Sequence, residues 1–201
     1  MLDLKKDVKF IASLLIIEGI IAICIVMIGD SNLFLVINGF SNPEIDFLCV
    51  YGAPSLFILY LIFSIIQACT DRKYGVWRIR ACGFNTIISG PAAYLFGRLL
   101  KEIFRRPRPY AVLPARVIGP WHASLYSFPS TTTMLAFGFA LPIFLKNFKV
   151  GTPLMLLASL IGFSVIYTGF HYPGDVLAGT FLSTLLVTFI NKCPLSFHRK
   201  R

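Results

Sequence analysis

Three short polar stretches interrupt an otherwise apolar chain, and their residue types suit phosphate chemistry. They are residues 101–109 (KEIFRRPRP), 129–132 (PSTT) and 171–175 (HYPGD). Lys101 and Arg108 in the first stretch are seven residues apart, a spacing that places two side chains on one face of a helix. An ammonium beside a planar guanidinium is suited to a phosphate dianion. Both residues are therefore candidate phosphate ligands.

The second stretch comes directly before an apolar run, where a helix is expected to begin. Ser130 is a good candidate for the N-cap of this helix. The first N–H groups of a helix have no partner within the helix, so they form a ready anion site. Ser130, Thr131 and Thr132 are thus candidate phosphate-binding residues. A plain helix cap that binds no ligand is the alternative interpretation of this stretch.

The third stretch contains a possible nucleophile with a partner. Asp175 follows His171 by four residues and lies near the expected start of a helix, where a carboxylate is favoured. A carboxylate that accepts a hydrogen bond from one ring nitrogen fixes the tautomer and leaves the other nitrogen free to attack. A histidine at a helix end is usually a satisfied interface residue. Its pairing with Asp175, opposite two phosphate-type cations, favours a catalytic role instead.

The elements that must position these residues are membrane helices. Of the 201 residues, 56% are hydrophobic, and the mean hydropathy is +0.75. Runs of about 18 or more apolar residues indicate an integral membrane protein. We expect an all-α fold, a six-helix bundle in a single domain of residues 1–201, with the active-site loops on the outer face. The predicted spans are residues 8–28, 47–69, 81–100, 128–145, 152–168 and 176–190, and residues 32–40 are expected to form a short amphipathic helix in the interface.

The charge pattern indicates the partners and the orientation. The formal net charge is +10, but the charges lie between apolar runs, so lipid head groups and phosphates are more natural partners than nucleic acid. Lys and Arg accumulate on the cytoplasmic side of membranes. This rule predicts a multi-pass plasma (inner) membrane protein with both termini in the cytoplasm and all three polar stretches facing outside or the periplasm. The five cysteines have no metal-ligand spacing, and the oligomeric state stays open.

One external segment carries more cations than the charge rule predicts. These cations lie between the third and fourth predicted spans: Arg98, Lys101, Arg105, Arg106, Arg108 and Arg116. Of these, Lys101 and Arg108 are the candidate phosphate ligands. For Arg98, Arg105, Arg106 and Arg116, contact with lipid head groups, or no specific role, is the favoured interpretation.

Taken together, the three stretches resemble the signature motifs of the type 2 phosphatidic acid phosphatase superfamily, most of all its small bacterial undecaprenyl diphosphatase branch. The matching motifs lie within residues 95–180 and read Lys101-(x)6-Arg108-Pro109, Phe128-Pro129-Ser130 and Gly169-Phe170-His171-Tyr172-Pro173-Gly174-Asp175. The resemblance implies that Lys101, Arg108, Ser130 and the following amides bind phosphate. It also implies that His171 forms a phosphohistidine while Asp175 orients it, without a metal or another cofactor.

The chain departs from the family pattern at two positions. The second motif of the family usually ends in a histidine that protonates the leaving group, and Thr131-Thr132 stands there instead. The third motif usually has Ser-Arg where this chain has Ser164-Val165. A general acid is worth about 10²- to 10⁴-fold in rate and a charge contact about 10²- to 10³-fold. A diphosphate substrate reduces the first loss, because a lipid phosphate leaves with less need of a proton than an alkoxide.

These departures leave three function classes open. The first is a lipid diphosphate or lipid phosphate phosphatase, in which His122 is a possible substitute acid and Arg105, Arg106 or Arg116 a substitute cation. The second is a catalytically impaired member that binds or presents a phosphorylated lipid. The third is a transporter or channel, suggested by Glu18 within the first predicted span. One acid with no matching partner in another span is thin support for the third.

Overall fold

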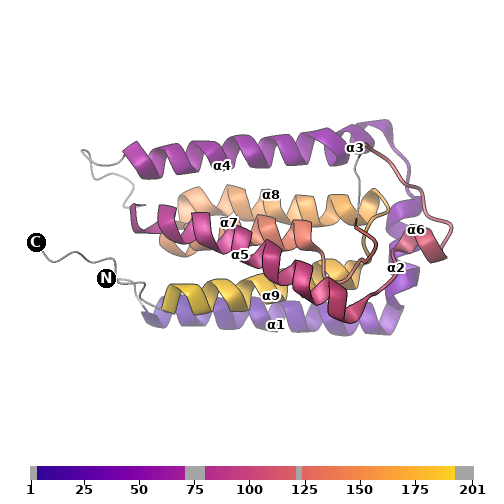
Figure 1. Ribbon diagram of the computed structural model, residues 1–201, viewed down its shortest axis with the longest axis horizontal. Coiled ribbons are helices and arrows are strands. Elements are labelled where there is room, and N and C mark those ends of the chain that lie inside the picture. The colour runs from indigo at the N-terminus through magenta and orange to yellow at the C-terminus, as the bar shows by residue number, and fades with distance from the viewer. Residues whose placement is uncertain (1–3, 71–79, 121–123, 193–201) are drawn as a thin grey trace, which may run out of the picture.

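Six long helices form the body of the protein (Figure 1). The computed structural model describes residues 4–70, 80–120 and 124–192. No strand occurs within these ranges, in agreement with the predicted all-α membrane fold. The six helices are α1 (Leu4–Ile28), α4 (Ala53–Thr70), α5 (Arg80–Phe104), α7 (Thr131–Lys146), α8 (Phe148–Tyr167) and α9 (Pro173–Lys192). Each coincides with one predicted span, although the bounds differ by a few residues.

Within the described residues, four segments are long and apolar enough to cross a membrane by themselves: Phe10–Ile28, Pro43–Ile66, Phe148–Tyr167 and Pro173–Asn191. The second of these is wider than α4 because it includes two short elements ahead of it. Helix α7 is apolar but has only 16 residues, fewer than the roughly 20 that a crossing needs. The multi-pass fold is thus supported, and the count of six crossings stays a prediction.

Helix α7 is the centre of the bundle. It packs against α5, α8 and α9, and most of its side chains are buried. Two glycines allow the close approach of α5 and α7. A Cβ at Gly138 would lie 2.9 Å from the Ser89 carbonyl oxygen, and a Cβ at Gly97 would lie 2.5 Å from Met134 Sδ. Small residues let membrane helices approach closely where the hydrophobic effect does not drive association.

Short elements close one end of the bundle. They are α2 (Asp30–Gly39), α3 (Pro43–Phe47), the π-helical turn η1 (Leu48–Gly52) and α6 (Pro109–Val112). Figure 1 shows α2, α3 and α6 at the end of the bundle opposite the start of α1. From the sequence we expected α2 to lie in the membrane interface. In the structure, α2 also packs against the rest of the protein. Phe34 is fully buried against Ile166 and Tyr172, and the Asn38 amide donates to the Tyr167 carbonyl at 2.8 Å.

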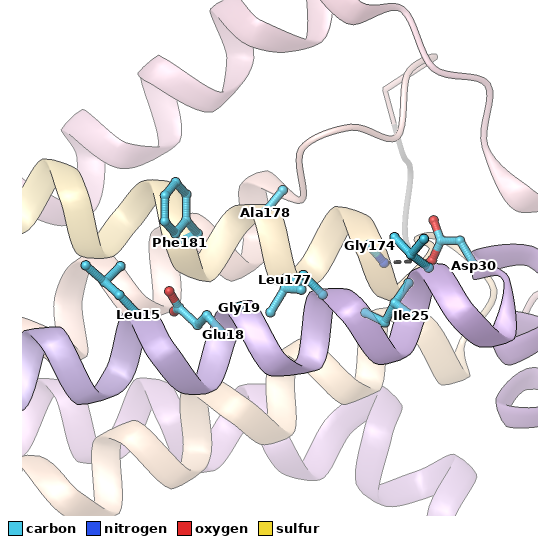
Figure 2. A pocket seen from close by; sticks show the side chains of 11 residues that line it. Leu15, Glu18, Gly19, Ile25, Asp30, Gly174, Leu177, Ala178 and Phe181 are labelled. Carbon is cyan, nitrogen blue, oxygen red and sulfur yellow. Dashed lines mark hydrogen bonds between the residues drawn. The ribbon is translucent and has the colours of Figure 1, made fainter.

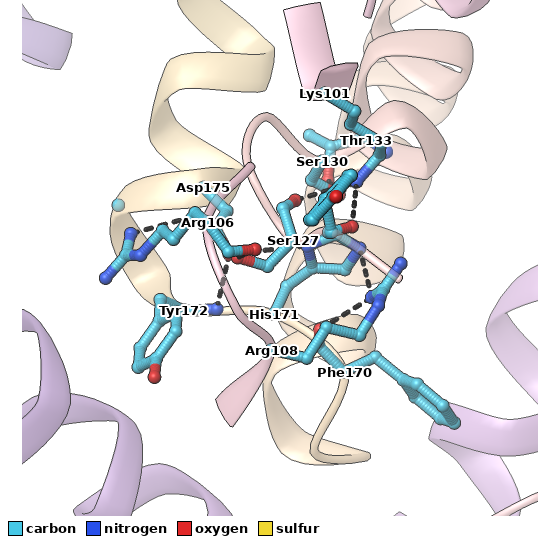
Figure 3. A network of polar contacts seen from close by, with 12 residues as sticks. Lys101, Arg106, Arg108, Ser127, Ser130, Thr133, Phe170, His171, Tyr172 and Asp175 are labelled. Atoms are coloured by element: carbon cyan, nitrogen blue, oxygen red, sulfur yellow. Dashed lines mark hydrogen bonds and ion pairs between the residues drawn. The ribbon is translucent and has the colours of Figure 1, made fainter. Parts of the chain in front are cut away.

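The three polar stretches meet at this closed end because three helix boundaries coincide there. Helix α5 ends at Phe104, and Arg105 follows in the left-handed region with φ 46°. Helix α7 begins after the cap Ser130, and α9 begins at Pro173, a residue suited to the first turn of a helix. The helix ends therefore deliver residues 105–109, 127–132 and 171–175 to one region (Figure 3).

Candidate active site

His171 and Asp175 form a buried pair. The exposed fraction is 3% for His171 and 0% for Asp175, and 3.4 Å separates Nδ1 of the ring from Oδ2 of the carboxylate. The same Oδ2 accepts a hydrogen bond from the Tyr172 N–H at 2.9 Å. The turn ahead of the pair needs Gly169, whose φ is +92° and whose Cβ, if it had one, would lie 2.5 Å from the Arg116 carbonyl oxygen.

Arg108 contacts the other nitrogen of the ring. Its Nη1 lies 3.2 Å from His171 Nε2 and donates to the Phe170 carbonyl at 2.7 Å, and its Nε donates to the Ser124 carbonyl. Because a guanidinium has no acceptor, Nε2 must accept this bond, which leaves the ring proton on Nδ1, facing Asp175. Burial lowers the pKa of His171 to about 4, so the imidazole is neutral near pH 7.

Arg106 holds the carboxylate from its other side, a role that sequence reasoning missed. Its Nη1 donates to Asp175 Oδ1 at 2.8 Å and its Nη2 to Asp30 Oδ2 at 2.7 Å, and the guanidinium lies 3.8 Å from the centre of the Tyr172 ring. Figure 3 shows the His171–Asp175 pair between Arg106 and Arg108. Asp30 is 76 positions away in the sequence, so no local spacing could reveal the contact.

Arg116 is also bound within the protein, which corrects the expectation of a head-group contact for both Arg106 and Arg116. Its Nη1 donates to both carboxylate oxygens of Asp46, at 3.0 and 2.9 Å. Its backbone N–H donates to Asn38 Oδ1 at 2.7 Å. Arg106 and Arg116 are therefore structural cations in this arrangement, and neither is free to replace the arginine that the family pattern has at position 165.

Lys101 supports the segment ahead of α7. Its exposed fraction is 1%, and its Nζ donates to the carbonyls of Tyr126 and Ser127, both at 2.8 Å. Ser127 in turn donates its backbone N–H to the Arg106 carbonyl at 2.8 Å. The ammonium thus ties the end of α5 to the entrance of α7. From the sequence we predicted that Lys101 binds phosphate. The contacts with two backbone carbonyls show that it also stabilises the loop between α5 and α7.

Ser130 caps α7 and joins it to α9. Its Oγ accepts from the Thr133 N–H at 3.4 Å and from Thr133 Oγ1 at 2.9 Å, and its own N–H donates to the Asp175 carbonyl at 3.0 Å. These contacts agree with the plain-cap interpretation of its hydroxyl. A main-chain hydrogen bond therefore joins the cap of α7 to the first turn of α9.

A cavity of about 360 Å³ adjoins the pair. Its walls come from η1, α4, α5, α7, α8 and the loop that carries the histidine, and its lining includes Arg98, Arg108, Thr131, Thr132, Val165 and His171. Lys101 and Ser130 do not line it. Both positions that depart from the family pattern, Thr132 and Val165, face this one space. His122, the possible substitute acid, lies outside the described residues.

Glu18 belongs to a different place in the fold. A groove of about 470 Å³ between α1 and α9 is lined by Leu15, Glu18, Gly19 and mostly apolar neighbours (Figure 2). Among the described side chains, none hydrogen-bonds Glu18 Oε2, which is buried. The groove shares no lining residue with the cavity at His171. The groove is also lined by Asp30, which accepts a hydrogen bond from Arg106.

Comparison with known protein families agrees with the resemblance seen in the motifs. Residues 81–199 match the model of the PAP2 superfamily. The chain is 34% identical over 161 residues to the undecaprenyl-diphosphatase BcrC of Bacillus subtilis, covering 79% of this chain and 80% of the relative. It is 29% identical over 188 residues to an undecaprenyl-diphosphatase of Sulfolobus acidocaldarius, covering 85% of this chain and 84% of the relative.

Two solved structures have the same fold. The transmembrane PAP2-type phosphatidylglycerolphosphate phosphatase of Bacillus subtilis superposes with a TM-score of 0.63 at 21% identity, covering 95% of this chain and 98% of the other. LpxE of Aquifex aeolicus superposes with a TM-score of 0.55 at 25% identity, covering 80% of this chain and 93% of the other. The helical arrangement is thus shared with a transmembrane PAP2-type phosphatase and with LpxE.

Proposed function

Because the chain belongs to the PAP2 superfamily, we propose that it is a membrane lipid phosphatase that hydrolyses an isoprenyl diphosphate of the undecaprenyl type. The substrate class follows the names of the two undecaprenyl-diphosphatases to which the chain is similar. We assign His171 as the nucleophile and Asp175 as the residue that orients it. The phosphate oxygens are bound by Arg108 and by the first amides of α7, at Thr131 and Thr132. Lys101 is assigned to the same phosphate-binding group.

The observation that supports this proposal most is the state of the His171 ring. Nε2 is unprotonated, accepts from Arg108 at 3.2 Å, and belongs to a side chain that lines the cavity. The low pKa of about 4 keeps the ring neutral, so attack needs no prior deprotonation. A phosphate that exchanges for the ring as a partner of Arg108 would bring its phosphorus to the lone pair of Nε2.

The proposed reaction needs no side chain of the protein as a general acid. Nε2 attacks the terminal phosphorus, the bond from that phosphorus to the bridging oxygen breaks, and the lipid phosphate leaves with the electron pair. The Nδ1 proton stays on the ring, where Asp175 stabilises the positive charge. Water then attacks the phosphohistidine, the electron pair of the P–N bond returns to Nε2, and inorganic phosphate carries away both protons of the water.

A catalytically impaired lipid-binding member is the second candidate, and one observation favours it. Thr132 and Val165, which stand where the family pattern has a histidine and an arginine, both line the cavity. An enzyme without both groups would be slower by about four to seven powers of ten if nothing compensated. Such a protein would still hold a phosphorylated lipid at Arg108.

Phosphate release from farnesyl diphosphate and farnesyl monophosphate separates the two candidates. We expect the purified protein to release phosphate from the diphosphate, to act on the monophosphate at least about 10²-fold more slowly, and to lose all release in His171→Gln. The double variant Thr131→Gly plus Thr132→His should raise the monophosphate rate most, because that leaving group needs the acid. Binding of both lipids with no release by the wild type would establish the lipid-binding candidate instead.

We also propose an orientation for the site in the membrane. The closed end of the bundle, with His171, faces outside or the periplasm, and the Leu4 and Lys192 ends face the cytoplasm, as the distribution of Lys and Arg indicates. A green fluorescent protein fused to the C-terminus should therefore fluoresce, and a fused periplasmic alkaline phosphatase should be inactive. The reverse pattern would place the site in the cytoplasm.

A further inference from the structure

Arg98 is a cation that lines the cavity and has no partner among the described residues. It lies on α5, three residues before Lys101, and its side chain lines the same space as Thr132 and Val165. It is exposed, and within the described parts of the chain it makes no hydrogen bond or ion pair. A charged arginine near apolar helix surfaces needs an anion or water to be stable.

The other cations of the region are already engaged. Lys101 donates to two carbonyls, Arg106 to two carboxylates and Arg116 to Asp46. Arg105 is exposed, does not line the cavity, and donates to the Glu102 carbonyl at 3.0 Å. Of the described lining residues, then, Arg98 and Arg108 alone carry a positive charge.

Both arginines line the cavity in which the two phosphates of a diphosphate would lie. The phosphate that His171 attacks must lie at Nε2, next to Arg108. The lipid-side phosphate is one bridging oxygen away, within the same cavity, whose other walls include apolar residues such as Ile161, Val165 and Phe170. A second phosphate placed there without a cation would be costly to desolvate.

We propose that Arg98 binds the lipid-side phosphate of the diphosphate and so replaces the arginine that the family pattern places at Val165. This inference rests on the proposed substrate class. The planar guanidinium bonds two oxygens of that phosphate at once. Arg98 is then a specificity-determining residue, because a lipid monophosphate has no second phosphate for it to bind.

The same contact compensates for the acid missing at Thr132. When the bond from the terminal phosphorus to the bridging oxygen breaks, negative charge develops on the lipid phosphate that leaves. Arg98 neutralises this charge where it forms, so the leaving group departs without a proton. The site thereby favours diphosphates over monophosphates in two ways. It binds the second phosphate, and it stabilises the charge on the leaving group.

Four proteins test the inference: the wild type, Arg98→Gln, the matched control Arg105→Gln, and Arg98→Gln combined with Val165→Arg. We expect Arg98→Gln to lower kcat/KM for farnesyl diphosphate by about 10²-fold and to weaken binding of this lipid far more than binding of farnesyl monophosphate. Arg105→Gln should stay within about threefold of the wild type, because Arg105 does not line the cavity. The added Val165→Arg should restore most of the loss, which a merely structural role of Arg98 would not allow.

Binding and turnover are measured separately so that each hypothesis can fail alone. If no lipid is hydrolysed but Arg98→Gln removes the preference for binding the diphosphate, the role of Arg98 stands and the proposed reaction is wrong. If the wild type hydrolyses farnesyl diphosphate and Arg98→Gln does so within threefold, with binding unchanged, the role of Arg98 is wrong and the reaction stands.

Discussion

At the scale of single residues, the two ring nitrogens of His171 have different surroundings. Nε2 accepts from Arg108, and Nδ1 faces the carboxylate of Asp175. Desolvation opposes the positive charge on the ring more strongly than the carboxylate favours it, and the pKa falls to about 4. The ring is thus prepared as a neutral nucleophile, while the carboxylate is in place to stabilise the charge that forms during attack.

This state of His171 predicts how stability changes with pH. The pKa is about 4 in the folded protein against 6.5 as its ordinary value, so between pH 6.5 and 4 the unfolded chain binds a proton that the folded protein does not. The free energy of unfolding therefore decreases as pH falls through this window, and the contribution of His171 to this decrease is about 2 kcal/mol at pH 5. Thermal unfolding of the wild type and His171→Gln, measured from pH 7 to pH 4.5, should show Tm falling more steeply in the wild type. Parallel curves would contradict a neutral, buried His171.

Asp30 and Arg106 act on the nucleophile through Asp175. Asp30 accepts from Arg106 and also from the Gly174 N–H at 2.8 Å, so it holds both the cation and the start of α9. We expect Asp30→Ala to lower kcat by about 10- to 100-fold through misplacement of the pair, with KM changed by less than about threefold. Glu44→Gln is the control, because Glu44 is an exposed acid of the same end of the bundle. A change in KM alone would exclude a positioning role for Asp30.

The residues of the candidate site were easier to predict from the sequence than the residues that support them. His171, Asp175, Arg108 and the cap Ser130 stand in short motifs whose spacing carries meaning. Arg106 does not: its partners come from α2 and α9, and an arginine in a basic loop gives no sign of distant carboxylates. The roles predicted for Lys101 and Ser130 were incomplete for the same reason, since their contacts with carbonyls and with Thr133 depend on how the chain turns between α5 and α7.

At the scale of the helices, the site depends on the close contact of α5 with α7. Helix α5 contributes Tyr94 and Arg98 to the lining of the cavity, and α7 contributes Thr131 and Thr132. The separation of the two helices therefore sets the width of the cavity between them. Hydropathy located both helices well. It could not show their closeness, which comes from glycines that look like ordinary residues of an apolar run.

Gly138→Ala tests the importance of this contact. The added Cβ would lie 2.9 Å from the Ser89 carbonyl oxygen and 3.0 Å from Gly90 Cα, so the two backbones must move apart. Overpacking of this kind costs about 1–3 kcal/mol, and we expect a lower Tm together with lower activity. Gly19→Ala is the control, because a Cβ at Gly19 meets nothing within 4 Å. Equal Tm values for the two variants would show that the α5–α7 contact tolerates a wider spacing.

Helix α2 shows the limit of hydropathy at this scale. Its length is too short for a crossing, which correctly separates it from the membrane spans. Its buried residues Phe34 and Asn38 pack on the ends of α8 and α9, and amphipathic patterns do not distinguish an interface of lipid from one of protein. The helix is thus part of the scaffold that fixes the loop ahead of His171.

At the scale of the whole molecule, most of the buried charged groups that the structure describes lie at one end of a membrane bundle. Apolar side chains of α1 and α4 remain exposed along the length of the bundle, as expected for a surface that meets lipid. Apart from Glu18 in α1, the buried charged residues among the described ones are Lys101, Arg108 and Asp175 at the closed end, and each of these three is paired or hydrogen-bonded. The fold class and the family could be predicted from the sequence, because composition and three ordered motifs are global properties of the chain.

The central claim is that His171 carries the phosphoryl group during turnover, and trapping this intermediate tests it most directly. The protein is mixed with farnesyl diphosphate labelled with ³²P at the terminal phosphate and quenched in alkaline detergent, which preserves phosphohistidine. We predict acid-labile label on the wild-type protein, located at residue 171, and none on His171→Gln. Phosphate release by His171→Gln at the wild-type rate, or a wild type that takes up no label, would contradict the account.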